Sequence, residues 1–387
     1  MLWINFLHLY QPATLDKGII MGAIDRSYTR LIKALLKNRE IKFTLSISGC
    51  LLEKLEEFSR QELLDDIKKL IERKQVELVG TAAYHPILPL IPREETERQV
   101  KLQEELIKKY FPGAKLKGFF LPEMAYSAEI AKIIKELGYE WIILDEIAGA
   151  GELDKLDCRK IYTDSNSGLA VIFRQREYSK SYVPQLLAKI GPAEKKTAII
   201  TATDAELYGL HHNDISGHLE KLLKNPNVET ATISEYIKNN PPERAIKIMA
   251  SSWESNAKEL NRRRPYVLWH NEKNKIQMKL WKLANLAWET VDRHQGDPQY
   301  QWAYWHLRRG LASCTFWWAS GHNFKNLMST FSWSPDEIER GLNELIRSIR
   351  TLDDAATRAT KIKAEKLYLK IKKLIWKKHW KYYWKRK

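Results

Sequence analysis

The stretch Thr-Ala-Ile-Ile-Thr-Ala-Thr-Asp-Ala-Glu-Leu-Tyr-Gly, residues 197–209, contains the pattern from which the fold is predicted. It begins as an apolar, β-rich run, which is typical of a buried strand, and turns polar at Asp204. Six more such runs occur upstream, and each is followed by a polar, helix-like segment. The seven predicted strands cover residues 3–9, 42–47, 76–80, 117–121, 141–144, 169–174 and 197–203.

Strands that alternate with helices indicate a parallel sheet built from βα units. Seven of them fit either an incomplete barrel or an open, doubly wound sheet. We favour the barrel because the polar motifs all follow the carboxyl ends of predicted strands, where a barrel gathers its functional loops. The predicted fold class is therefore α/β, with an incomplete seven-stranded (β/α) barrel followed by a helical domain.

The chain changes character near Pro241-Pro242, after which strand patterns are few and helical spacing dominates. Residues 274–292, 301–319 and 336–353 have the spacing of helices. We therefore predict a catalytic barrel domain over residues 1–240, a helical domain that completes the cleft over 241–360, and a basic, aromatic C-terminal helix or tail over 361–387.

The charge of the chain is concentrated in that last segment. Residues 361–387 contain twelve Lys or Arg and one Glu, so they supply +11 of the net charge of +16. The remainder is only mildly basic, which argues against a nucleic-acid partner. Two interpretations of the segment stay open: a terminal helix that docks its apolar stripe on the body, or a weak contact with an anionic surface.

Three cysteines, Cys50, Cys158 and Cys314, lack the short spacings of a disulfide framework or a zinc site. The N-terminal residues do not resemble a secretory signal, and every apolar run is shorter than the roughly 20 residues that span a bilayer. We therefore expect a soluble protein of the reducing cytoplasm.

Two acidic residues directly follow predicted strands. Glu123 lies in Leu-Pro-Glu-Met-Ala-Tyr, residues 121–126, and Asp204 opens Asp-Ala-Glu-Leu-Tyr-Gly, residues 204–209. Two carboxylates at one rim are the minimum equipment for cleaving a glycosidic bond, since one attacks the anomeric carbon and the other moves a proton. Taken alone, Glu123 also fits an acid in the first turn of a helix, where the macrodipole favours it.

Histidines accompany these acids and leave a second chemistry open. His8 and His85 lie at or just beyond the ends of two other predicted strands, while His211 and His212 lie just beyond Glu206. Together with Asp204, such residues are also suited to zinc or a harder divalent ion. The chain is rich in Trp (14) and Tyr (17), whose rings can stack on sugar faces or fill a core.

Taken together, the motifs resemble those of glycoside hydrolase family 57, a group of α-amylases, 4-α-glucanotransferases, branching enzymes and amylopullulanases. They occur in the family's order. The matching stretches are His-Leu-Tyr-Gln-Pro (8–12), Glu-Leu-Val-Gly (77–80) continuing to His85-Pro86, Leu-Pro-Glu (121–123), Asp-Ala-Glu-Leu-Tyr-Gly (204–209), Ser-Ser-Trp (251–253) with the later 269–281, and Ser-Cys-Thr-Phe-Trp-Trp (313–318).

The resemblance implies a retaining mechanism with Glu123 as nucleophile and Asp204 as acid/base, and no required metal or cofactor. The implied substrate is an α-1,4-glucan oligo- or polysaccharide. The predicted substrate-binding residues are His8, Tyr10, Gln11, His85, Tyr126, Glu206, His211, Trp253, Trp317 and Trp318. The family often has a second His where this chain has Tyr10, and an Asp where it has Cys314, so these positions bear on sugar binding.

The sequence thus predicts an enzyme of the α-amylase or 4-α-glucanotransferase type, whose balance of hydrolysis and transfer stays open. Two alternatives belong to other classes: a non-catalytic glucan-binding protein on the same scaffold, and a metal-dependent hydrolase or deacetylase that uses Asp204 and the histidines.

Overall fold

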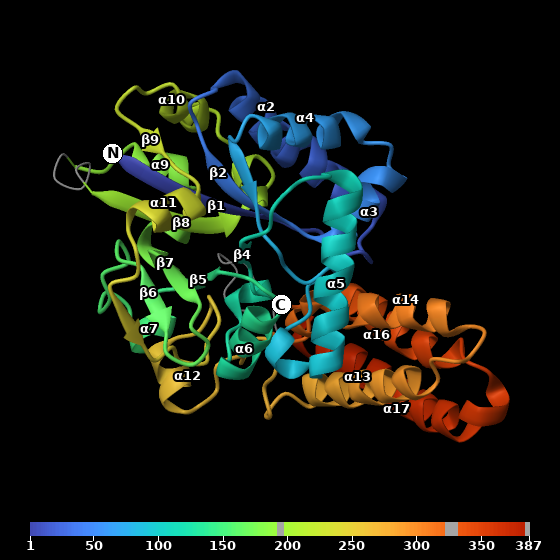
Figure 1. Cartoon of the computed structure of the whole chain (residues 1–387). Coiled ribbons are helices and arrows are strands. Elements are labelled where there is room, and N and C mark those ends of the chain that lie inside the picture. The colour runs from blue at the N-terminus through green and yellow to red at the C-terminus, as the bar shows by residue number, and fades with distance from the viewer. Residues whose placement is uncertain (192–196, 322–331, 384–387) are drawn as a thin grey trace. The chain divides into compact units, whose positions relative to one another are not determined.

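The computed structural model describes residues 1–191, 197–321 and 332–383 (Figure 1). Its backbone contacts divide the chain into two compact units. The first consists of Met1–Gln11, Leu15–Ala83 and Leu88–Pro265. The second gathers Pro12–Thr14, Tyr84–Ile87 and Tyr266–Lys387. The three-part division at residues 240 and 360 stays a prediction.

The first unit contains two five-stranded sheets. Sheet one is ordered β3-β2-β1-β8, with β9 also pairing with β1, and sheet two is ordered β10-β6-β7-β5-β4. The strands of sheet one are β1 (Leu2–Leu9), β2 (Phe43–Ile47), β3 (Val76–Leu78), β8 (Ala198–Asp204) and β9 (Glu229–Thr230). Those of sheet two are β4 (Gly118–Phe119), β5 (Trp141–Asp145), β6 (Tyr162–Asp164), β7 (Ala170–Arg174) and β10 (Arg244–Ile246). All described pairs are parallel except β6 with β7.

Two narrow seams join the sheets edge to edge. Between β3 and β4, Gly80 N donates to Gly118 O at 2.9 Å and Phe120 N donates to Gly80 O at 2.8 Å. Between β7 and β8, Gln175 N donates to Ile200 O at 2.9 Å. The seven strands predicted from the sequence therefore follow one another as β1-β2-β3-β4-β5-β7-β8 and return to β1, which confirms the incomplete seven-stranded barrel.

Helices follow the strands of this unit, as the βα pattern predicted. They are α1 (Lys17–Ala23), the π-helix η1 (Ile24–Tyr28), α2 (Thr29–Lys37), α3 (Gly49–Glu57), α4 (Gln61–Glu72), η2 (Leu88–Leu90), α5 (Arg93–Tyr110), η3 (Pro122–Met124), α6 (Ala128–Glu136), α7 (Ile147–Ala150), α8 (Arg176–Ser179), α9 (Val183–Leu187), η5 (Ala205–Tyr208), α10 (His218–Leu223), α11 (Ile233–Asn239) and α12 (Ala257–Asn261).

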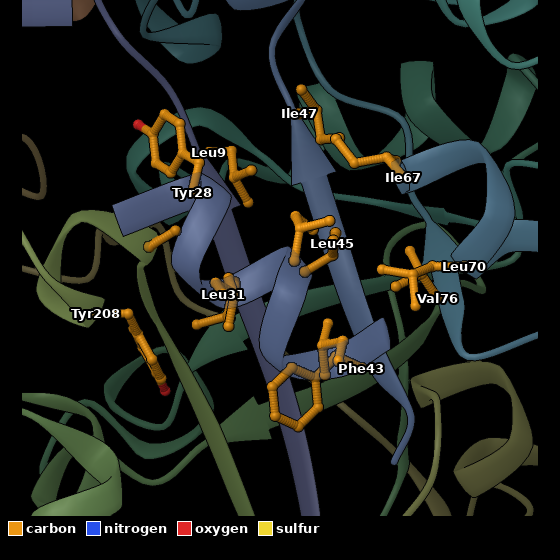
Figure 2. Packing of buried hydrophobic residues seen from close by; sticks show 14 of the residues in the cluster. Leu9, Tyr28, Leu31, Phe43, Leu45, Ile47, Ile67, Leu70, Val76 and Tyr208 are labelled. Atoms are coloured by element: carbon orange, nitrogen blue, oxygen red, sulfur yellow. The ribbon is translucent and has the colours of Figure 1, made fainter. Parts of the chain in front are cut away.

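The strands of the first unit have buried residues on both of their faces. Successive side chains of a strand point to opposite faces. Phe43, Leu45 and Ile47 of β2 therefore share one face, where they belong to a buried cluster with residues of α2 and α4 (Figure 2). On β1, Phe6 and His8 share the other face, and their rings lie 5.0 and 4.5 Å from that of Phe120. The strands thus bury both faces.

The second unit is helical in its described part. Its helices are α13 (Lys275–Arg293), α14 (Tyr300–Gly310), α15 (Ser313–Trp317), α16 (Pro335–Arg350) and α17 (Asp354–Tyr383). They confirm that a helical region follows the barrel.

The long C-terminal helix α17 packs on α13 and α16. Its Ala364, Ile371 and Ile375 are fully buried, and Tyr368 Oη donates to Asn343 Oδ1 at 2.8 Å. An apolar stripe of the basic segment therefore docks on its own unit, as one of the two sequence interpretations predicted.

Candidate active site

Glu123 lies just beyond strand β4 in an unusual backbone conformation. Its φ is 60° and its ψ is 17°, and the next residue, Met124, also has a positive φ of 48°. Left-handed backbone at a residue other than glycine costs on the order of 1–3 kcal/mol and occurs often at functional sites. Here it turns the chain sharply at the carboxyl end of the strand.

The helix that follows does not include Glu123. α6 begins at Ala128, and its N-cap is Ser127, whose Oγ accepts from Ile130 N at 3.3 Å. Glu123 instead belongs to the short 3₁₀ turn η3. Glu123 therefore does not lie in the first turn of the α-helix α6.

Asp204 is the last residue of β8 and pairs in register with His8 of β1. It is partly buried and lines a cavity of about 350 Å³, whose other walls include Arg174, Trp253 and Glu254. Burial raises the pKa of Asp204 to about 6; Arg174 opposes this shift and Glu254 adds to it. Asp204 is therefore a carboxyl group able to hold a proton in mildly acidic solution.

Trp253 connects the segments that contain the two acids. Its backbone N–H donates to the carbonyl of Glu123 at 3.1 Å, and its own carbonyl accepts from Arg174 Nη2 at 3.3 Å. Its ring centroid lies 5.1 Å from the guanidinium carbon of Arg174, and the residue lines the cavity that contains Asp204. One loop residue thus contacts the turn of Glu123 and the surroundings of Asp204.

Glu206 is part of a buried hydrogen-bond network. Gln11 Nε2 donates to Glu206 Oε1 at 2.6 Å and to Tyr28 Oη at 3.1 Å. The Tyr28 hydroxyl also hydrogen-bonds to Glu206 Oε1. Burial first, and then the charge of Asp204, raise the pKa of Glu206 to about 8. A group of this kind is largely protonated at neutral pH.

The histidines contact aromatic rings and backbone groups. His8 is buried against the rings of Phe120 and Tyr10. The backbone N–H of His211 donates to the backbone carbonyl of Glu206 at 2.9 Å. His212 stacks on Tyr182 with a centroid distance of 4.2 Å. Across the three described stretches of the chain, no group of three or more His, Cys, Asp or Glu is arranged to hold a metal ion.

The second unit contains three other residues that were predicted to bind substrate. His85 Nδ1 lies 3.0 Å from Ser313 Oγ, and burial lowers the pKa of this imidazole to about 3. Trp317 and Trp318 are partly buried, and their rings meet edge to face with a centroid distance of 4.6 Å. Their predicted substrate contacts stay predictions.

Tyr126, another predicted site residue, is buried and hydrogen-bonded within the first unit. Its side chain is fully buried in the first unit, and its hydroxyl donates to Asp164 Oδ2 at 2.9 Å. Its backbone also pairs with Ser251. The geometry gives Tyr126 a clear role in holding the loop that precedes Trp253, while its predicted sugar contact stays a prediction.

Sequence reasoning missed the ion pairs beside Asp204. Asp145, at the end of β5, accepts from Arg174 Nε at 2.7 Å and from Arg176 Nη2 at 2.7 Å. These bonds fix the guanidinium of Arg174 at the cavity. A signal existed, because Asp145 directly follows an apolar strand, as Glu123 and Asp204 do. Tyr28 was also missed. Its hydrogen bond to Glu206 depends on the π-helix η1, which no local sequence pattern predicts.

Comparison with known proteins gives a consistent result. The sequence profile described as glycosyl hydrolase family 57 matches residues 5–249. An α-amylase of Pyrococcus horikoshii is 35% identical over 174 residues, which are 44% of this chain and 27% of the relative. A 4-α-glucanotransferase of Thermococcus litoralis is 25% identical over 272 residues, which are 65% of this chain and 41% of the relative.

The solved structures agree on the fold. The crystal structure of a GH57-type branching enzyme from Pyrococcus horikoshii has a TM-score of 0.69 at 16% identity and covers 95% of this chain and 94% of that one. At this identity the likeness concerns the fold alone. The match to the two curated relatives spans less than half of their length. No helix in the described part of the chain is long and apolar enough to cross a membrane.

Proposed function

Because the chain belongs to glycosyl hydrolase family 57, we propose that it is a retaining enzyme that acts on α-1,4-glucans by hydrolysis or by transfer. Glu123 is the nucleophile and Asp204 the acid/base. The observation that supports these roles is the backbone conformation of Glu123 together with the raised pKa of Asp204. One follows β4 in a left-handed turn, and the other ends β8 with a pKa raised to about 6.

The first chemical step uses the acids in opposite protonation states. The Glu123 carboxylate attacks the anomeric carbon, the glycosidic C–O bond breaks, and Asp204 gives its proton to the departing oxygen. The product is a glycosyl ester on Glu123 and an ionised Asp204. A raised pKa suits Asp204 to this task because the group must begin protonated.

The second step restores both groups. Asp204 removes a proton from water or from a glucan hydroxyl, whose oxygen attacks the anomeric carbon and releases the Glu123 carboxylate. Attack by water is hydrolysis, and attack by a sugar hydroxyl is transfer. For retention, we predict that the two carboxyl groups lie about 5–6 Å apart, since inversion requires a wider gap for water.

Product analysis tests the reaction. The purified chain is incubated with maltooligosaccharides and the products are separated by chromatography. Shorter products indicate hydrolysis, and a redistribution of lengths indicates transfer. An unchanged substrate would contradict the proposal and would favour a non-catalytic glucan-binding protein.

Azide tests the two roles separately. Replacing Glu123 with Gly removes the attacking group, so azide should then give a glycosyl azide of inverted configuration from an activated substrate. Asp204→Ala should retain turnover of substrates with good leaving groups, and azide should trap its ester intermediate with net retention. Glu129→Gln, an exposed acid on α6, is the matched control and should behave as the unchanged chain. Similar azide products from both variants would contradict the assignment.

We also propose a cytoplasmic location. It is supported by Cys50, Cys158 and Cys314, none of which forms a disulfide within the described residues, because disulfides are rare in reducing compartments. Fractionation of cells that produce the protein, with immunodetection, tests this assignment.

A further inference from the structure

The docked helix α17 leaves a second apolar stripe facing water. Ile362, Leu369 and Trp380 are 50%, 62% and 50% exposed. They are spaced by seven and eleven residues, close to two and three turns, so they lie along one line of the helix. This line is opposite Ala364, Ile371 and Ile375, which are buried against the second unit. The docking of α17 therefore does not account for its exposed stripe.

Lysines surround this stripe. Lys363, Lys366 and Lys370 of α17, with Lys279 and Lys282 of α13, line an open groove of about 900 Å³. The two helices pack side by side (Figure 1). Ile362 lies in the same groove. Farther along the exposed face of α17 follow Lys373, Lys377 and Lys381.

The positive charge of this face is not compensated. None of these eight lysines has an ion pair with a carboxylate within the described residues. The one acid that lines the groove, Glu289, is 3.5 Å from Arg293 and so is already partnered. Closely spaced ammonium groups create a positive electrostatic potential, which attracts an anionic surface.

We propose that this face, formed by the exposed side of α17 and the groove with α13, binds the surface of an anionic lipid bilayer. The apolar stripe lies at the boundary of headgroups and acyl chains, where Trp is favoured, and the lysines extend to the headgroup phosphates. The groove gives such phosphates a place between the lysines of two helices.

The combination of residues favours a bilayer over other anionic partners. A polynucleotide or polyphosphate would pair with the lysines but leave three large apolar side chains in water. A neutral glucan would offer the lysines no negative charge. A bilayer with anionic lipids satisfies both features at once.

Vesicle flotation with the full chain tests the proposal. We expect binding to vesicles of phosphatidylglycerol and phosphatidylcholine in equal amounts to be at least roughly tenfold stronger than to pure phosphatidylcholine. The variant Lys363→Glu/Lys366→Glu/Lys370→Glu should lose this preference. Leu369→Asp should weaken binding to the mixed vesicles about tenfold or more, because it places a charge on the membrane side of the stripe.

A matched control comes from the same unit. Trp302 on α14 is 60% exposed and lies outside the groove lining, so Trp302→Ser should bind the vesicles as the unchanged chain does. Circular dichroism should show the same helix content for all variants, since the replaced residues are exposed. Trp380 fluorescence, read as the difference between the unchanged chain and Trp380→Phe, should shift to shorter wavelength on mixed vesicles.

Three results would overturn the proposal. Equal binding to neutral and anionic vesicles would remove the role of the lysines. Full vesicle binding by Leu369→Asp would remove the role of the stripe. Retention of single-stranded RNA that depends on the lysines, without any vesicle binding, would assign the face to a polyanion instead.

Discussion

At the residue scale, Asp204 and Glu254 face the same cavity, and the negative charge of Glu254 helps to raise the pKa of Asp204. The proposed acid must be protonated, so activity should fall as pH rises through about 6. We expect Glu254→Gln to move this alkaline limb of the kcat/KM profile to lower pH. The Glu129→Gln control should leave the profile in place, and an unmoved limb in Glu254→Gln would show that the two carboxylates are not coupled.

Glu206 allows a prediction about stability. Its pKa is raised to about 8 in the folded chain, above the ordinary value of 4.5. The free energy of unfolding therefore falls as pH rises from about 4.5 toward 8, because the unfolded chain loses this proton at a lower pH than the folded chain does. The variant Glu206→Gln keeps a side-chain oxygen that can accept from Gln11 Nε2, and its amide cannot ionise.

We expect Glu206→Gln to gain stability relative to the unchanged chain between pH 5 and pH 8, by on the order of 1–3 kcal/mol. Denaturant unfolding at both pH values measures the difference. A constant difference at the two pH values would contradict the raised pKa.

At the scale of elements, Gly209 lets the turn η5 pass close to the π-helix η1. A Cβ at this position would lie 1.9 Å from the backbone carbonyl oxygen of Arg26. A backbone atom cannot be moved aside as a flexible side chain can. The junction between the segments of Tyr28 and Glu206 therefore requires glycine.

Gly209→Ala should destabilise the chain by about 1–3 kcal/mol, and weaken the contact between Tyr28 and Glu206. Thermal unfolding followed by circular dichroism measures the effect. Gly18→Ala on α1 is the matched control, because nothing lies within 4 Å of a Cβ added there. It should change stability by no more than about 1 kcal/mol. Equal melting of the two variants would show that η1 can shift without cost.

The elements differ in how well the sequence predicts them. All seven strands inferred from largely apolar runs exist, and most of their residues are buried, including polar ones such as Asn5 and Thr201. β6 (Tyr-Thr-Asp) and β9 (Glu-Thr) are short and polar, so no apolar run marks them in the sequence. The π-helix η1 and the pairing of Arg174 with Asp145 depend on contacts between distant segments, which local patterns do not record.

At the scale of the whole molecule, the unit boundary could not be read from composition. The second unit includes Pro12–Thr14 and Tyr84–Ile87, which come from within the first 90 residues. The composition change near residue 241 lies close to β10 (Arg244–Ile246), the last described strand, but it does not reveal loops contributed from elsewhere in the chain.

The same scale shows two roles for one helix. Ile371 of α17 is fully buried and Leu369 is 62% exposed, although they are two residues apart. Ile371→Ala should lower stability by about 2–5 kcal/mol. Leu369→Ala, the matched control, should stay within about 0.5 kcal/mol of the unchanged chain. Thermal unfolding compares the pair, and equal losses would show that α17 is not docked through its Ile371 face.

The two seams of the barrel have a mechanical consequence. Glu123 follows β4, which belongs to one sheet, whereas Asp204 ends β8, which belongs to the other. The gap between the carboxyl groups is therefore spanned by the joints between sheets and not by a continuous ladder. Backbone hydrogen bonds at Gly80 and Gln175 link the strands at those joints. The carboxyl spacing that the proposed retaining mechanism requires thus depends on how these two joints hold the sheets together.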